Sequence, residues 1–142
     1  MKVLFVNGPN LNMLGTREED VYGSLTLDQI NKKITSKANE LKITTDFFQS
    51  NVEGNLVSKI QESSDFDYIV INPAAFTHTS IAIRDALLSI KAKFIEVHLS
   101  NIYSREDFRH SSYVSSIAIG VISGFGFHGY LMALDYISSL KD

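Results

Sequence analysis

Residues 68–97 read YIVINPAAFTHTSIAIRDALLSIKAKFIEV, and this stretch contains a complete strand–helix–strand unit. The short apolar runs Tyr68–Ile71 and Phe94–Val97 have the length and the β-branched and aromatic composition of buried strands. Between them, residues 80–90 carry apolar side chains at mainly helical spacing. Two short strands joined by a helix are typical of a parallel pair with a right-handed crossover. The stretch therefore predicts a parallel α/β sheet.

The rest of the chain continues this alternation on both sides. Three further strands are expected at residues 3–6, 43–48 and 117–122. Three further helices are expected, of which one is capped by Thr26, one contains Leu56, Val57 and Ile60, and the last contains Leu131, Leu134, Ile137 and Leu140. Five strands separated by helices predict a single αβα three-layer domain over residues 1–142, with a flavodoxin-like, doubly wound, five-stranded parallel sheet. Ligands of such sheets bind beyond the carboxyl ends of the strands.

The composition excludes several classes of protein. The 142 residues contain no cysteine, which excludes thiolate zinc sites, iron–sulfur clusters, disulfides and a cysteine nucleophile. The 13 Lys and Arg residues against 16 Asp and Glu residues argue against a nucleic-acid partner. No apolar stretch approaches the roughly 18 residues of a membrane span. The first apolar run is too short for a signal peptide, so we expect a cytoplasmic protein without a membrane partner.

Charged and polar side chains gather in the loops that follow the predicted strands. Three of the four arginines and all four histidines fall in these loops or in the glycine-rich segment after the last strand, whereas most of the nine lysines lie elsewhere. Arginine suits an anionic ligand because its planar guanidinium can bind a carboxylate through two parallel hydrogen bonds. The distribution predicts an anion-binding site at the carboxyl edge of the sheet.

Two of these polar residues form a pair at the end of one strand. Glu96 and His98 lie two residues apart, so their side chains point to the same face of the sheet. A carboxylate in this position can orient an imidazole for proton transfer, and a purely structural salt link would have the same spacing. The sequence alone leaves both interpretations open.

The segment from Gly124 to Gly129 fits the dinucleotide-binding pattern G-x-G-x-x-G after a strand. However, too few residues follow Gly129 for the second strand and acidic side chain that such a site needs. We expect these glycines to allow close packing of a helix on the sheet. A module that binds FMN or a nucleotide without catalysis remains the alternative function, and a yellow colour of the purified protein would indicate bound flavin.

Strings along the whole chain together resemble one family. They are NGPNLNMLGTREEDVYG (7–23), FQSNVEG (48–54), INPAAFTHTS (71–80), EVHLSN (96–101), REDFRHSSY (105–113) and GVISGFGFHGY (120–130). In this order they are similar to the type II 3-dehydroquinate dehydratases, although Val52 stands where the family often has histidine. The resemblance implies a dodecamer built as a tetramer of trimers. It implies cofactor-free removal of water from 3-dehydroquinate, to give 3-dehydroshikimate in the shikimate pathway.

The resemblance also implies roles for individual residues. Tyr22 would be the base that removes the proton next to the ketone, and Arg17 would keep that tyrosine ionised. His98 would protonate the departing hydroxyl with Glu96 as its partner, and Asn10 would lie beside the developing enolate. The other implied positions bind substrate. Arg109 would clamp the carboxylate of the substrate, and a neighbouring subunit would supply Asp85. The remaining positions are Asn72, His78, Leu99, Ser100 and Arg105.

Overall fold

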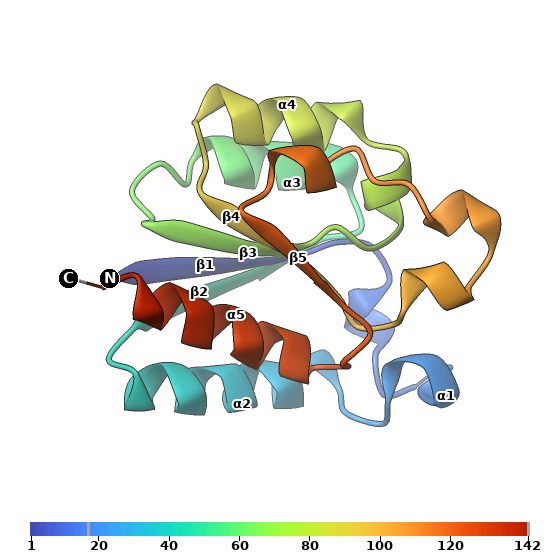
Figure 1. Cartoon of the computed structure of the whole chain (residues 1–142), viewed down its shortest axis with the longest axis horizontal. Helices are drawn as coiled ribbons and strands as arrows, with labels where there is room; N and C mark the ends of the chain where they lie inside the picture. Colours follow the sequence, from blue (N-terminus) through green and yellow to red (C-terminus); the bar gives the residue numbers. More distant parts are fainter. Residues whose placement is uncertain (17, 142) are drawn as a thin grey trace.

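The computed structural model describes residues 1–16 and 18–141. Its five strands form one parallel sheet in the order β2-β1-β3-β4-β5 (Figure 1). Helices α2 and α5 cover one face of the sheet, and α3 and α4 cover the other. The predicted flavodoxin-like three-layer α/β fold is thereby confirmed. The strands are β1 (Lys2–Asn7), β2 (Thr44–Gln49), β3 (Tyr68–Asn72), β4 (Phe94–His98) and β5 (Gly120–Ser123).

Five α-helices and five 3-10 turns lie between and after the strands in the part of the chain that the structure describes. The α-helices are α1 (Glu19–Tyr22), α2 (Leu27–Glu40), α3 (Glu53–Gln61), α4 (Ile81–Ser89) and α5 (His128–Ser139). The 3-10 turns are η1 (Leu11–Met13), η2 (Ala74–His78), η3 (Ile102–Ser104), η4 (Asp107–Arg109) and η5 (Ser115–Ile117). Within these described residues, no helix has both the length and the apolar character needed to cross a bilayer.

Two apolar cores lie on the two faces of the sheet, as the period of two along a strand requires. In β1, Val3 and Phe5 belong to the core beneath α2 and α5, whereas Leu4 and Val6 belong to the core beneath α3 and α4. All four side chains are buried. Burying each one contributes about 1.5 to 3 kcal/mol, which explains why an unbroken apolar run forms the centre of the sheet.

Most predicted elements are confirmed, and the differences have local causes. Thr26 caps α2 as expected, because its hydroxyl accepts from the backbone N–H of Gln29 while the Gln29 side chain accepts from the Thr26 N–H. The fifth strand begins at Gly120 rather than at Ile117, because residues 115–117 turn in η5 and Ile117 packs against the core under α3 and α4. The expected loop at residues 7–24 contains η1 and α1.

The turn after β1 and the turn after β3 approach each other closely at the carboxyl edge of the sheet, and this is where the site lies. The backbone N–H of Gly8 donates to the carbonyl oxygen of Asn72 at 2.8 Å. A Cβ atom at position 8 would lie 2.3 Å from the carbonyl oxygen of Pro73, so only glycine permits this approach. The sheet order changes direction between β1 and β3, and ligands of doubly wound sheets bind at such a switch point.

Candidate active site

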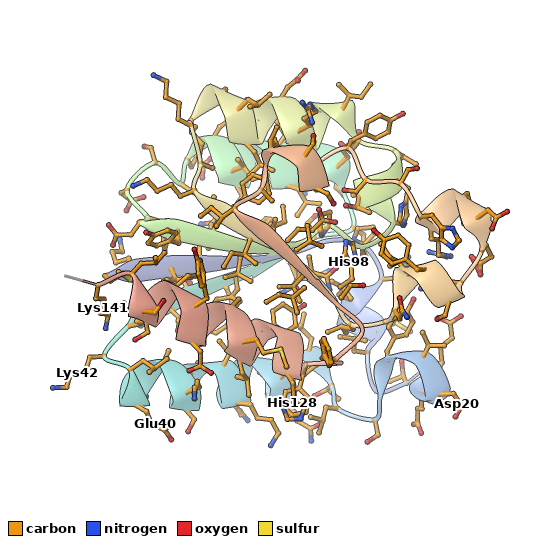
Figure 2. The ribbon with its side chains drawn as sticks, viewed as in Figure 1. Asp20, Glu40, Lys42, His98, His128 and Lys141 are labelled. Atoms are coloured by element: carbon orange, nitrogen blue, oxygen red, sulfur yellow. The ribbon has the colours of Figure 1, made fainter. Side chains whose placement is uncertain are left out.

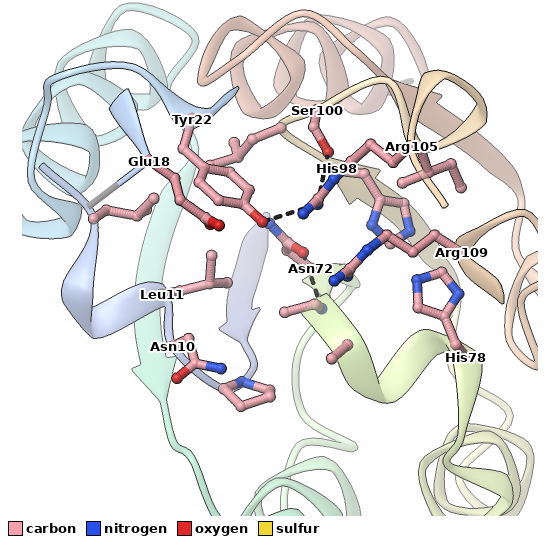
Figure 3. A pocket seen from close by; sticks show the side chains of 16 residues that line it. Asn10, Leu11, Glu18, Tyr22, Asn72, His78, His98, Ser100, Arg105 and Arg109 are labelled. Atoms are coloured by element: carbon pink, nitrogen blue, oxygen red, sulfur yellow. Dashed lines mark hydrogen bonds between the residues drawn. The ribbon is translucent and has the colours of Figure 1, made fainter. Parts of the chain in front are cut away.

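A pocket of about 210 Å³ opens at this switch point, beyond the carboxyl ends of β1, β3 and β4 (Figure 3). Figure 2 shows one of its residues, His98, at the end of the sheet far from Lys42 and Lys141. Nine residues predicted from the sequence line it together: Asn10, Tyr22, Asn72, His78, His98, Leu99, Ser100, Arg105 and Arg109. The sequence did not indicate its other lining residues, which are Pro9, Leu11, Leu14, Glu18, Ala74, Ala75 and Ile102.

Two of the predicted site residues that the structure describes, Glu96 and Asp85, do not line this pocket. Glu96 lies behind His98 and is fully buried. Asp85 lies on α4 with an exposed side chain, away from the pocket wall. Arg17 lies outside the residues that the structure describes.

A buried tyrosine supports the floor of the pocket from below. The Tyr130 hydroxyl donates to Asn7 Oδ1 at 2.6 Å and accepts from Asn72 Nδ2 at 3.1 Å. Asn72 Oδ1 in turn accepts from the backbone N–H of Ala74 at 3.1 Å. Complete burial raises the pKa of the Tyr130 hydroxyl, so this group stays protonated and can donate and accept at once. Asn72 is therefore held in one orientation at the end of β3.

The turn that carries Asn10 is braced by the residues after β2. The backbone N–H of Asn10 donates to Asn51 Oδ1 at 2.9 Å, and Gln49 Nε2 donates to the carbonyl oxygen of Gly8 at 3.1 Å. Asn10 has a left-handed backbone with φ of 68°, which asparagine tolerates better than most residues. Two strings far apart in the sequence, NGPN and FQSN, thus form one unit at the pocket rim.

The carboxylate of Glu96 contacts Nε2 of His98 through its Oε2 atom, as the spacing of the two residues predicted. Burial raises the pKa of Glu96, but hydrogen bonds from His98, Ser115 and Thr77 outweigh burial and hold this pKa below its ordinary value. Glu96 is therefore an anion at neutral pH. No pattern in the sequence indicated its partners Thr77, Ser112 and Ser115, although Thr77 and Ser112 stand inside the strings INPAAFTHTS and REDFRHSSY.

Two arginines from one loop reach into the pocket. Arg105 Nη1 donates to the Tyr22 hydroxyl at 2.9 Å and lies 3.4 Å from Ser100 Oγ. The guanidinium carbon of Arg105 lies 5.4 Å from the centre of the Tyr22 ring. Arg109 is ion-paired with Glu106 and lies on the side of the pocket that holds His78 (Figure 3). A cation is therefore in direct contact with the phenol oxygen.

The surroundings of His78, the second histidine of the pocket, favour its neutral form. Burial lowers the pKa of His78, and the nearby His98 and Arg109 lower it further, against a hydrogen bond to Ser111 that raises it. Nδ1 of His78 lies 2.7 Å from the carbonyl oxygen of Ser111, which can only accept. Nδ1 therefore carries the proton in the neutral ring, and Nε2 is the acceptor that remains for a ligand.

Among residues 1–16 and 18–141, no group of three or more His, Asp or Glu side chains could hold a metal ion. The last glycine of the G-x-G-x-x-G pattern packs closely, since a Cβ at Gly129 would lie 3.0 Å from Val97 Cγ1 and 3.4 Å from Ile122 Cγ2. This contact supports the expected role of Gly129 in packing α5 on the sheet. The described residues that line the pocket supply phenol, guanidinium, imidazole, hydroxyl, amide and carboxylate groups.

Comparisons with known proteins agree with this architecture. The sequence family described as "Dehydroquinase class II" matches residues 1–138. A 3-dehydroquinate dehydratase of Endomicrobium trichonymphae is 59% identical over 140 residues, which are 98% of both chains. A type II dehydroquinase from Butyrivibrio crossotus has a solved structure with a TM-score of 0.94 and 46% identity, covering 96% of this chain and 97% of that one. The corresponding structure from Propionibacterium acnes has a TM-score of 0.93 and 41% identity, covering 97% and 96%. The chain belongs to the class II dehydroquinase family.

Proposed function

We propose that this chain is a hydro-lyase that dehydrates 3-dehydroquinate to 3-dehydroshikimate. Its relatives in Endomicrobium trichonymphae and Bordetella avium are named for this activity, at 59% and 58% identity. The observation that carries the proposal is the contact of the Tyr22 phenol with the Arg105 guanidinium, in the same pocket as an imidazole held by a buried carboxylate. A base activated by a cation and a separate acid are what an elimination through an enolate requires.

The first step is removal of the proton next to the ketone, and we assign it to Tyr22. A phenol is a weak base at neutral pH, so its anion must be stabilised by a nearby positive charge. The 2.9 Å hydrogen bond from Arg105 supports this role. The family resemblance assigns a second such cation to Arg17.

The enolate that results carries negative charge on the former ketone oxygen. Preorganised hydrogen-bond donors at that oxygen lower the barrier, because they need no reorganisation as charge develops. We assign this function to Asn10, directly or through a water molecule. The hydrogen bonds of Asn51 and Gln49 to this turn keep Asn10 at the pocket rim and support the assignment.

The second step expels the hydroxyl group, which leaves as water after protonation by His98. Glu96 stabilises the charged imidazole and fixes its orientation through the contact with Nε2. We assign substrate binding to the remaining lining residues, in which Arg109 clamps the carboxylate and Nε2 of His78 accepts from a substrate hydroxyl. The other binding residues are Asn72, Leu99, Ser100 and Arg105. No step requires a metal ion or an organic cofactor.

We further propose that the enzyme is cytoplasmic, serves the shikimate pathway, and assembles as a dodecamer of four trimers. In this assembly Asp85 reaches the pocket of a neighbouring subunit. The exposed position of Asp85 on α4, away from its own pocket, supports this role. Asp85→Ala should weaken substrate binding, and sedimentation of the wild-type protein as a monomer would contradict the assignment.

The decisive experiment measures the conjugated enone of the product by ultraviolet absorbance after addition of 3-dehydroquinate. We expect turnover by the wild-type protein, and almost none by Tyr22→Phe, which should still bind substrate. Absence of product with the intact wild-type protein would refute the proposed function. A flavodoxin-like FMN or nucleotide-binding module is not favoured, because the family match spans residues 1–138.

A further inference from the structure

Three hydroxyl groups surround the carboxylate of Glu96, and we call them the hydroxyl cage: Thr77, Ser112 and Ser115. Thr77 Oγ1 donates to Glu96 Oε2 at 2.9 Å, and Ser115 Oγ donates to Oε1 at 2.6 Å. Ser112 Oγ lies 3.2 Å from Oε1 and 3.3 Å from Oε2. With His98 Nε2 on Oε2, both carboxylate oxygens of this fully buried residue have donors.

Two backbone N–H groups limit the directions in which the hydroxyl protons can point. Ser112 Oγ accepts from the backbone N–H groups of Val114 and Ser115, both at 3.1 Å, so its own proton is left to donate. That proton goes either to Glu96 or to Thr77 Oγ1 at 2.9 Å, and Thr77 then donates to Glu96. The cage therefore delivers donors to Glu96 in every arrangement, and it matches a charged carboxylate rather than a neutral acid.

We propose that Thr77, Ser112 and Ser115 are positioning residues for the dehydration, because they keep Glu96 charged and hold it against Nε2 of His98. This inference rests on the function proposed above. Since Glu96 occupies Nε2, Nδ1 is the nitrogen of His98 left to deliver the proton to the departing hydroxyl. Within the described residues, His98 Nδ1 has no hydrogen-bond partner, and this atom is not fully buried.

The cage also connects the acid to the rest of the pocket. The backbone N–H of Tyr113 donates to the carbonyl oxygen of Thr77 at 2.8 Å, and the carbonyl of Ser111 accepts from His78. The segment that carries the two cage serines is thus attached to η2, which carries Thr77 and His78. Loss of a cage hydroxyl should therefore raise the pKa of Glu96 without removing any side chain that lines the pocket.

The charged and titratable groups around the Glu96–His98 pair come from three other elements. His78 on η2 stacks near His98 with ring centres 6.5 Å apart, and Arg109 of η4 lies close enough to His78 to lower the pKa of His78. Arg84 of α4 donates to the carbonyl oxygen of Tyr113 and to the hydroxyl of Ser116 in η5. None of the cage substitutions below alters these groups, so a change in titration reports on the cage itself.

The test compares Ser115→Ala with Ser115→Thr, which keeps the hydroxyl, and with Ser116→Ala as the matched control. Ser116 is the next serine of η5, and its hydroxyl contacts Arg84 rather than Glu96. We expect Ser115→Ala to raise the pKa of Glu96, measured on the ¹³C-labelled side-chain carboxyl by NMR. Because the charged carboxylate loses one hydrogen bond, we expect kcat to fall about tenfold with KM nearly unchanged. The acidic limb of the pH profile should move to higher pH.

Ser115→Thr should restore most of the rate, and Ser116→Ala should behave like the wild type. If Ser115→Ala does not fold, Thr77→Val and Thr77→Ser form the equivalent pair. An unchanged Glu96 titration in the folded alanine or valine variant would overturn the proposal, as would an equal loss of kcat in Ser116→Ala. The carboxyl titration requires no turnover, so an inactive wild-type protein would refute the dehydration while the cage is still tested.

Discussion

Replacing Arg105 with methionine keeps much of the length and apolar stem of the side chain but removes a cation that donates to the Tyr22 hydroxyl at 2.9 Å. If Tyr22 acts as an anion, this substitution should slow proton removal more than it weakens substrate binding. The size of the effect follows from the geometry. A separation of about 4 Å between the guanidinium charge and a phenolate oxygen gives about 4 kcal/mol at an effective dielectric constant of about 20.

Tyr22 and Arg105 are both half-buried, so solvent screening reduces this value to about 2 to 3 kcal/mol. At about 1.36 kcal/mol for each factor of ten, kcat of Arg105→Met should be about 30- to 160-fold below that of the wild type. Arg105→Lys keeps the charge but loses the planar donor, so an intermediate rate is expected.

The assay is the initial rate of enone formation, measured for Tyr22→Phe, Arg105→Met and the double variant. If the guanidinium acts through the phenol, the second substitution adds almost no loss once Tyr22 is phenylalanine. A kcat for Arg105→Met within about threefold of the wild type would refute the reasoning. So would losses that multiply in the double variant, because Arg105 would then act independently of Tyr22.

Three further predictions concern stability and pH. The pKa of Glu96 is lower in the fold than its ordinary value of 4.5, so its charge stabilises the fold above that pH, and the contribution is lost as the pH falls through the lower pKa. The stability advantage of the wild type over Glu96→Gln, measured by urea unfolding, should therefore shrink as the pH falls below 4.5. Tyr130→Phe should lower the free energy of unfolding by about 1 to 3 kcal/mol, because Asn7 and Asn72 lose a buried partner; an unchanged urea midpoint would contradict this. Gly8→Ala should destabilise by about 1 to 3 kcal/mol and also reduce turnover, since its Cβ would lie 2.3 Å from the carbonyl oxygen of Pro73; a variant with wild-type stability would show that the turns can separate at no cost.

The sheet was predictable from the sequence because its signals are local. The apolar runs in β1, β3 and β4 are buried on both faces and need no partner information to recognise. The predicted start of β5 at Ile117 was wrong, because Ile117 continues the apolar pattern of the strand while its backbone turns in η5. Here tertiary packing decided the backbone conformation, which hydrophobicity along the chain does not describe.

The candidate site was predictable to the extent that it follows from strand ends. Glu96 and His98 meet because alternate residues of a strand share a face, and the loops after parallel strands reach one edge. The contact between Tyr22 and Arg105 spans 83 residues, and the cage hydroxyls lie 16 to 19 residues from Glu96. Such contacts depend on how two loops fold over the edge, for which the sequence has no periodic signal.

The loop after β4 shows why spacing alone could not separate the two arginines. Arg105 and Arg109 are four residues apart, the distance of one helical turn, which would bring them to the same side of a helix. Instead, η3 ends before Arg105 and η4 begins at Asp107, so the chain changes direction between them. One guanidinium therefore contacts the phenol, while the other is ion-paired with Glu106 on the side of His78. A single short loop thus supplies positive charge to two parts of the pocket, where the proposed reaction needs it for the base and for the carboxylate of the substrate.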